Sequence, residues 1–280
     1  MKKIYISLRI SMPEELFEQA VALLSVFPFT GIEELTDEIE ITFNREDYNP
    51  AIREEITALI KNLHSNSEIV SENEIRERNW NEEWEKNLTP VLIGDVAITP
   101  EIKKDEVNAV NKIIINPKMS FGTGHHATTR LMCGMMKDNI SPGSFWIDAG
   151  TGTGILAILA VIYGAGKVLA FDNSEWAVNN TIENIRLNNV EDRIDVREAD
   201  IFNLKLPEAD GILANINQPI IEKMMKKFHK SLINNNGILI ASGILKYNSS
   251  TLLEIAELTG FEIAKTEVED EWVAYKFRAV

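Results

Sequence analysis

The feature that most constrains this chain is a glycine-rich turn between an apolar strand and an apolar helix. Residues 146–156 read WIDAGTGTGIL, with Asp148 near the end of the strand and three glycines in the turn. Glycine lets a backbone turn tightly and approach a ligand, and the following helix offers unpaired N–H groups at its N-terminus. A purely structural turn would use the same residue types. The residues farther along the chain favour the ligand-binding interpretation.

Acidic residues follow the turn at the ends of the next two predicted strands. Asp172 ends the strand after the glycine turn, the position that receives ribose hydroxyls in Rossmann-like folds. Asp200 follows one strand later, where a carboxylate could reach an adenine amino group. The glycine spacing is G-x-G-x-G, unlike the dinucleotide fingerprint, and no P-loop lysine accompanies it. The pattern therefore predicts a nucleoside-bearing ligand other than a dinucleotide or a nucleoside triphosphate.

A second turn-rich loop lies before the glycine turn. Residues 115–130 read INPKMSFGTGHHATTR and pass directly into a helix with Thr128 and Thr129 in its first turns. Small residues and hydroxyls of this kind can close over the amino-acid end of a cofactor. Adjacent His125 and His126 do not converge as metal ligands, and no carboxylate or cysteine cluster accompanies them, so we predict no metal site.

Asn215 ends an apolar strand at residues 212–215, and Pro219 follows shortly after it. The carboxyl ends of the strands are where α/β sheets hold their ligands. An asparagine side-chain oxygen can accept a hydrogen bond from an amine. Asparagine before a turn is also ordinary loop chemistry, so this residue alone leaves both interpretations open.

The periodicity of the chain predicts two domains and a linker. Residues 1–73 read as strand, helix, strand, strand, helix, strand, the ferredoxin-like order. Such a fold hosts many binding functions and specifies none by itself, and we expect this domain to recognise the substrate. Residues 74–90 are charged and carry Trp80 and Trp84 four positions apart, which predicts a linker helix. Residues 91–280 alternate strands and helices, which predicts a mostly parallel sheet covered on both faces. The strands expected there span residues 91–98, 112–116, 145–148, 168–172, 194–198, 211–215, 237–242 and 272–277.

Charge and cysteine content narrow the partners and the compartment. The formal net charge is −15, with 43 acidic against 28 basic residues, so direct nucleic-acid binding is not expected. A basic protein partner suits this charge, and so does solubility alone. The single cysteine fits a reducing compartment, and the chain has neither a signal-peptide pattern nor a stretch long enough to span a membrane. We therefore expect a cytoplasmic protein without membrane attachment.

Taken together, residues 116–130, residues 148–156, Asp172 and residues 214–219 resemble the PrmA family of bacterial ribosomal protein L11 methyltransferases. FGTGHHATTR is the most specific segment of the resemblance. The resemblance implies a Rossmann-like S-adenosylmethionine-dependent methyltransferase domain behind a small ferredoxin-like α+β domain. It also implies N-methylation of lysine ε-amines and of the N-terminal α-amine of L11, either free or within the large ribosomal subunit, by a monomeric enzyme. The alternative is an S-adenosylmethionine-dependent methyltransferase for another protein or a small molecule.

The resemblance carries cofactor roles onto individual positions of this sequence. We predict S-adenosyl-L-methionine as the cofactor and Asn215 as the residue that could orient the acceptor amine; the sequence assigns no residue as a catalytic base. The predicted cofactor-binding residues are Phe121, Thr129, Asp148, Gly150, Gly152, Asp172, Asp200 and Asn215.

Overall fold

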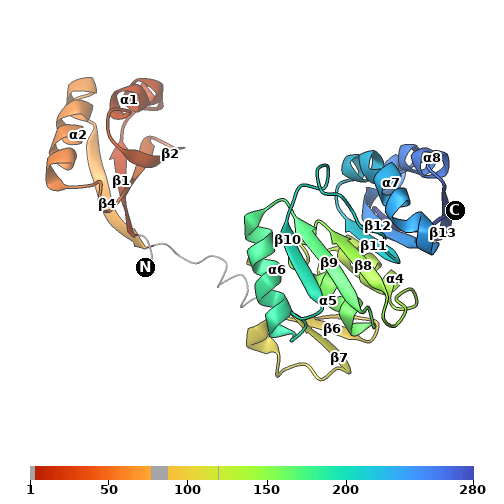
Figure 1. Cartoon of the computed structure of the whole chain (residues 1–280). Coiled ribbons are helices and arrows are strands. Elements are labelled where there is room, and N and C mark those ends of the chain that lie inside the picture. The colour runs from red at the N-terminus through yellow and green to blue at the C-terminus, as the bar shows by residue number, and fades with distance from the viewer. Residues whose placement is uncertain (1–3, 77–87, 119) are drawn as a thin grey trace. The chain divides into compact units, whose positions relative to one another are not determined.

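The computed structural model describes residues 4–76, 88–118 and 120–280. The chain divides into two compact units, residues 1–80 and residues 81–280 (Figure 1). Each unit has its own hydrophobic core, and each is described by itself below.

The first unit is a four-stranded antiparallel sheet with two α-helices. Its strand order is β2-β3-β1-β4, which confirms the predicted ferredoxin-like arrangement. Helix α2 begins after Asn49, whose side chain accepts hydrogen bonds from the N–H groups of Ala51 and Ile52, and Pro50 occupies the first helical position. The elements are β1 (Ile4–Ser11), η1 (Glu14–Leu16), α1 (Phe17–Leu24), β2 (Phe29–Leu35), β3 (Glu38–Asn44), α2 (Pro50–Leu63) and β4 (Glu68–Arg76).

The predicted start of the linker helix at residue 74 is wrong, because β4 continues through Arg76. Ile75 pairs with Tyr5 and Arg76 pairs with Ile4, so the main chain here is held by β1. β4 is an edge strand, and charged side chains are tolerated along such an edge, which the sequence interpretation took for a helix. Residues 77–87, with Trp80 and Trp84, lie outside the described residues.

The second unit is built on a seven-stranded sheet in the order β10-β9-β8-β11-β12-β14-β13. The pairs from β10 to β12 are parallel, and β14 joins β12 and β13 in antiparallel register. A separate three-stranded sheet, β5-β6-β7, precedes it. The elements are β5 (Val91–Ile93), β6 (Val96–Thr99), η2 (Glu101–Lys103), β7 (Asn111–Ile114), α4 (Ala127–Met136), β8 (Phe145–Ala149), α5 (Ile155–Ile162), β9 (Lys167–Asp172), α6 (Glu175–Leu187), β10 (Ile194–Glu198), β11 (Gly211–Asn215), α7 (Gln218–Leu232), η3 (Ile233–Asn235), β12 (Ile238–Leu245), η4 (Lys246–Asn248), α8 (Ser250–Leu258), β13 (Phe261–Glu269) and β14 (Trp272–Ala279).

Helices cover both faces of this sheet, as expected for an α/β domain (Figure 1). One core cluster joins α4 and α5 to alternate residues of the central strands, including Trp146 and Val168. The other cluster joins α7 and α8 to the intervening residues of the same strands, including Ile147 and Leu169. The predicted mostly parallel, Rossmann-like architecture is confirmed.

Two parts of the second unit differ from the sequence prediction. The strand expected over residues 91–98 is a hairpin of β5 and β6, because Gly94 at φ +59° allows the chain to reverse. β13 was not predicted, since it is an edge strand whose side chains are mostly exposed and lack an apolar alternation. Among the residues that the structure describes, no helix is both long and apolar enough to span a bilayer.

Candidate cofactor and acceptor site

The glycine turn lies at the carboxyl end of β8 and is held against the end of β9. The N–H groups of Gly150 and Thr151 both donate to the carbonyl of Phe171, at 2.9 and 3.0 Å. The N–H of Gly152 donates to Oδ2 of Asp172 at 3.1 Å. The predicted ribose-binding carboxylate therefore lies directly beside the turn. One of its oxygens helps to shape the turn, and the other accepts the Ser174 N–H at 3.1 Å.

Close backbone approaches explain why glycine occupies the turn. Gly152 has φ +57°, and a Cβ there would lie 2.4 Å from the carbonyl oxygen of Phe121. Gly150 has φ +73°, and its Cβ would lie 2.4 Å from Cγ2 of Ile216, just after β11. The turn therefore touches both the preceding loop and the segment after β11, so three separate parts of the chain meet at one place.

Asp148 is buried under this turn. Its Oδ2 accepts hydrogen bonds from the Thr151 hydroxyl at 2.7 Å and from the Ala157 N–H at 3.2 Å. Burial raises the pKa of Asp148 to about 7, while the Thr151 and Ala157 hydrogen bonds oppose that rise. The carboxyl group thus fixes the turn to the first residues of α5.

A small cleft opens beside the glycine turn, with a volume of about 110 Å³. It brings together three predicted cofactor residues, Gly150, Asp172 and Asp200. Both oxygens of Asp200 are engaged in its own turn, with the N–H of Phe202 and the side chain of Asn203, each at 2.9 Å. Its contact with adenine stays a prediction. The rest of the lining is mostly apolar: Phe171, Asn173, Ala199, Ile201, Phe202, Ile216 and Ile220.

The loop after residue 120 is fixed to the glycine turn through Thr153. The Thr153 N–H donates to the carbonyl of Phe121 at 2.9 Å, and its hydroxyl donates to the carbonyl of Gly122 at 2.7 Å. The exposed Phe121 ring packs edge-on against His126, which packs in the same way against Trp272. His126 also caps α4, since its Nδ1 accepts the Thr128 N–H at 3.3 Å. Phe121 therefore lies between the turn and the start of α4.

Buried polar atoms without a hydrogen-bond partner are concentrated around this turn. Such atoms cost free energy unless a ligand or water pairs with them. Within the described residues six side chains carry one, and only Tyr48 belongs to the first unit. The other five come from segments that meet at or flank the turn: Ser120 Oγ, Thr129 Oγ1, Asp148 Oδ1, Asn180 Oδ1 and Asn215 Oδ1.

These residues fit S-adenosylmethionine. An apolar cleft beside Asp172 suits a base attached to a ribose, because the carboxylate can accept hydrogen bonds from the ribose hydroxyls. The unpaired Thr129 hydroxyl and Asp148 oxygen can form hydrogen bonds with the amino-acid end of this cofactor. No group of three histidine, cysteine, aspartate or glutamate side chains in the described ranges could hold a metal ion.

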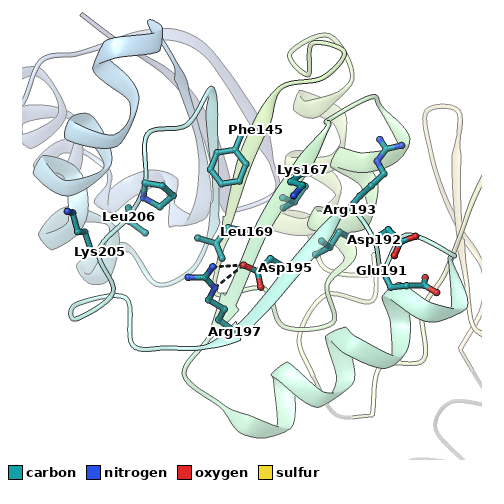
Figure 2. A pocket seen from close by; sticks show the side chains of 13 residues that line it. Phe145, Lys167, Leu169, Glu191, Asp192, Arg193, Asp195, Arg197, Lys205 and Leu206 are labelled. Atoms are coloured by element: carbon teal, nitrogen blue, oxygen red, sulfur yellow. Dashed lines mark hydrogen bonds and ion pairs between the residues drawn. The ribbon is translucent and has the colours of Figure 1, made fainter.

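A larger hollow, about 730 Å³, lies elsewhere on the same sheet (Figure 2). It opens over the first residues of β8, β9 and β10, away from the glycine turn. Figure 2 shows Phe145 and Leu169 among the side chains that line it, together with the ion pair of Asp195 and Arg197, in which Arg197 Nε lies 3.0 Å from Asp195 Oδ2. The segment between β10 and β11 contains no helix, which leaves this part of the sheet face without a helical cover. None of the predicted site residues lines the hollow.

The sequence interpretation missed several residues that shape the site. The apolar cleft lining, such as Ile201 and Ile216, falls in short loops where no periodicity marks it. Trp176, Asn180 and Asn184 bind the segment before the loop, and their four-residue spacing on a helix was a readable signal.

Comparison with known proteins gives one consistent result. The family model described as "Ribosomal protein L11 methyltransferase (PrmA)" matches residues 9–279. A ribosomal protein L11 methyltransferase from Chlorobaculum parvum is 34% identical, covering 96% of this chain and 95% of the relative. The Porphyromonas gingivalis protein of that name is 40% identical over 71% of this chain and 69% of its own length. The crystal structure of a ribosomal protein L11 methylase from Lactobacillus delbrueckii subsp. bulgaricus aligns with a TM-score of 0.63 and 26% identity, covering 69% of this chain and all of that chain.

Proposed function

We propose, because this chain belongs to the PrmA family of ribosomal protein L11 methyltransferases, that it methylates lysine ε-amines and the N-terminal α-amine of ribosomal protein L11. The methyl donor is S-adenosyl-L-methionine. We place the reaction in the cytoplasm, where free L11 and the large ribosomal subunit are both present. A net charge of −15 suits a basic substrate surface.

The observation that carries the proposal is the unpaired side-chain oxygen of Asn215. This atom is buried without a partner in the structure, at the carboxyl end of β11. β11 pairs with β8, with Ala214 opposite Ala149, so Asn215 lies next to the start of the glycine turn. A buried acceptor at this point is available for an N–H of the incoming amine.

The chemistry asks little of the protein beyond binding and orientation. The cofactor supplies a methyl group already activated on a sulfonium. The amine must arrive uncharged, since a protonated lysine has no lone pair, and its reference pKa is about 10.4. Asn215 Oδ1 accepts one amine N–H and so directs the nitrogen lone pair toward the methyl group. The proton leaves to water before attack, and no side chain here is assigned as a base.

We further propose that the first unit, through the end of β4 at Arg76, recognises the substrate, that the residues from there to 90 link the domains, and that residues 91–280 carry catalysis. All of the predicted cofactor residues lie in the second unit, which has its own cores. The first unit therefore has no assigned role in cofactor binding, and recognition of L11 is the role we give it.

The decisive experiment is transfer of radiolabelled methyl groups from S-adenosylmethionine to purified L11. The parent chain should label L11 on lysine and on its N-terminus, and mass spectrometry of peptides would locate the groups. Asn215→Ala should lower kcat by about tenfold or more, since its loss removes one hydrogen bond to the acceptor, and should weaken S-adenosylhomocysteine binding by a smaller factor. A fragment of residues 81–280 should still bind S-adenosylhomocysteine but should transfer few methyl groups to L11. Labelling of other proteins or small molecules in place of L11 would support the alternative substrate class and overturn this proposal.

A further inference from the structure

One face of helix α6 binds the main chain of residues 114–118. This segment leads into the loop at residues 120–126, which we call the cofactor loop because it contacts the glycine turn. Three side chains on this face and the C-cap residue just after it, each four residues from the next, form what we call the α6 ladder: Trp176, Asn180, Asn184 and the C-cap Asn188. Residues with this spacing project from the same side of a helix. All four hydrogen-bond to backbone groups between residues 114 and 118.

The contacts follow the segment in order. Asn188 accepts the Ile114 N–H at 2.9 Å and donates to the Ile114 carbonyl at 2.7 Å. The Asn116 N–H donates to Asn184 Oδ1 at 2.9 Å, and the Asn116 carbonyl accepts from Asn180 Nδ2 at 2.7 Å. These side-chain amides therefore make the main-chain hydrogen bonds that a neighbouring strand would make in a sheet.

Trp176 makes the outermost contact of the ladder. Its indole Nε1–H donates to the carbonyl of Lys118 at 2.6 Å, although 57% of the residue is exposed. Lys118 has φ +42°, a left-handed conformation that costs a non-glycine residue about 1–2 kcal/mol. Its side chain also pairs with Glu183 on the same helix. Two residues of α6 thus hold Lys118 in a conformation that it would not adopt alone.

The spacing of the two partners explains why the ladder forms. Four residues of an α-helix rise about 6 Å, and two residues of extended chain advance about 6.6 Å. Alternate residues of an extended segment can therefore meet every fourth residue of a helix over a short stretch, and here the longer helical span is accommodated because Asn180 and Asn184 both bond Asn116. Ile114, Asn116 and Lys118 are such alternate residues, and they run antiparallel to α6.

The same helix also holds the glycine turn. Asn184 Nδ2 donates to the carbonyl of Thr153 at 2.9 Å, and the Thr181 hydroxyl donates to the carbonyl of Gly152 at 2.9 Å. Asn180 and Asn184 are almost fully buried, so these contacts are shielded from water. α6 is therefore bonded both to the glycine turn and to the segment entering the loop above it.

We propose that the α6 ladder sets the position of the cofactor loop, and that Trp176 is a positioning residue that acts through the carbonyl of Lys118. Phe121 and Gly122, three and four residues after Lys118, accept hydrogen bonds from Thr153 of the turn. A displacement of Lys118 would therefore also displace Phe121 and Gly122, which contact the glycine turn. This inference rests on the cofactor site of the proposed enzyme and not on the identity of its acceptor.

The test compares two adjacent asparagines and one conservative tryptophan variant in the full chain. Asn180→Ala removes a ladder contact, whereas Asn179→Ala changes its exposed neighbour on the same helix. Trp176→Phe keeps an aromatic ring but removes the N–H donor. We would measure S-adenosylhomocysteine affinity by calorimetry, amide hydrogen exchange in residues 114–118 and 120–122, and the melting temperature.

Asn180→Ala and Trp176→Phe should each weaken S-adenosylhomocysteine binding about fivefold, the effect of one hydrogen bond of about 1 kcal/mol, and should speed exchange in the loop. Asn179→Ala should match the parent in both measurements. Trp176→Phe should leave the melting temperature unchanged, so a folding defect cannot produce its result. If Trp176→Phe binds the ligand as tightly as Asn179→Ala does, the positioning role is overturned, whether or not exchange is faster. These measurements use no L11, so they fail or succeed separately from the substrate assignment.

Discussion

Two hollows at opposite ends of β8, β9 and β10 differ in a way that separates volume from function. The larger, about 730 Å³, lies over the first residues of β8, β9 and β10, and the smaller, about 110 Å³, lies at their carboxyl ends. None of the residues that line the larger one, all of which the structure describes, carries a buried side-chain atom without a hydrogen-bond partner. Arg197 pairs with Asp195, and Arg193 donates to the carbonyls of Val161 and Ala165 at 3.0 and 2.6 Å.

The small cleft shows the opposite condition. Around it the main chain is tightly bonded, but oxygens of Thr129, Asp148 and Asn215 are buried without partners. A protein retains such atoms at a cost, so their concentration marks the place where a ligand completes the hydrogen bonding. Unpaired hydrogen-bonding capacity, and not the size of a cavity, is therefore what favours the carboxyl ends of these strands as the place of the ligand.

The largest expected effect comes from filling the space at Gly152. In Gly152→Ala the new Cβ would lie 2.4 Å from the Phe121 carbonyl oxygen, so the loop and the turn must separate. We expect S-adenosylhomocysteine affinity to fall about 100-fold, equivalent to about 2.7 kcal/mol. Calorimetric titration measures it. Gly94→Ala is the matched control, since Gly94 has a similar φ of +59° but nothing within 4 Å of its Cβ. Equal affinities in the two variants would show that the close contact between Gly152 and Phe121 does not support cofactor binding.

A second, intermediate effect concerns the buried carboxyl under the turn. The folded-state pKa of Asp148 is about 7, above its ordinary value of 3.8, so the folded protein holds this proton more tightly than the unfolded chain. The stability from this group is therefore fully present below pH 3.8 and is lost as pH rises toward about 7. Between these two pH values the free energy of unfolding should fall by up to about 1 kcal/mol per pH unit.

Urea unfolding at a series of pH values would measure this slope. Asp148→Asn should remove it, so the variant should gain stability relative to the parent as pH rises. Thr151→Val removes the hydroxyl that donates to Asp148 Oδ2 at 2.7 Å and favours the ionised form. It should move the upper end of the window to higher pH. Parallel pH profiles for parent and Asp148→Asn would contradict the assignment of the slope to this carboxyl.

The sequence predicted the parts of this site that rest on local chemistry. Glycines mark the turn, and Asp172 and Asn215 end apolar strands, so parallel-sheet geometry was enough to place them at one edge. The ferredoxin-like order of the first unit was predictable for the same reason, since alternating strands such as β3 bury one face.

Contacts between distant segments were not predictable from local patterns. The segment at 114–118 meets α6 about 60 to 70 residues later in the chain, through side-chain amides that alone indicate only polar character. Asp200 illustrates the converse, because its position after a strand suggested a ligand contact while its oxygens also serve the local turn. The edge strand β13 lacked a buried face, so its pattern gave no signal.

The smallest effect should come from the larger hollow. Arg197 and Asp195 are two residues apart on β10, and their side chains are 53% and 57% exposed. An exposed ion pair of this kind contributes about 0–1 kcal/mol, because water and salt screen it and its side chains lose entropy when they are held together. Arg197→Ala should therefore change the free energy of unfolding by less than about 0.5 kcal/mol. S-adenosylhomocysteine affinity should stay within about twofold of the parent, since the pair lines none of the cofactor cleft. Urea unfolding and calorimetry measure the two quantities, and methyl transfer to L11 provides the third comparison. A tenfold loss of affinity or of transfer in Arg197→Ala would show that the hollow takes part in function, and the contrast between the two ends of the sheet would then be wrong.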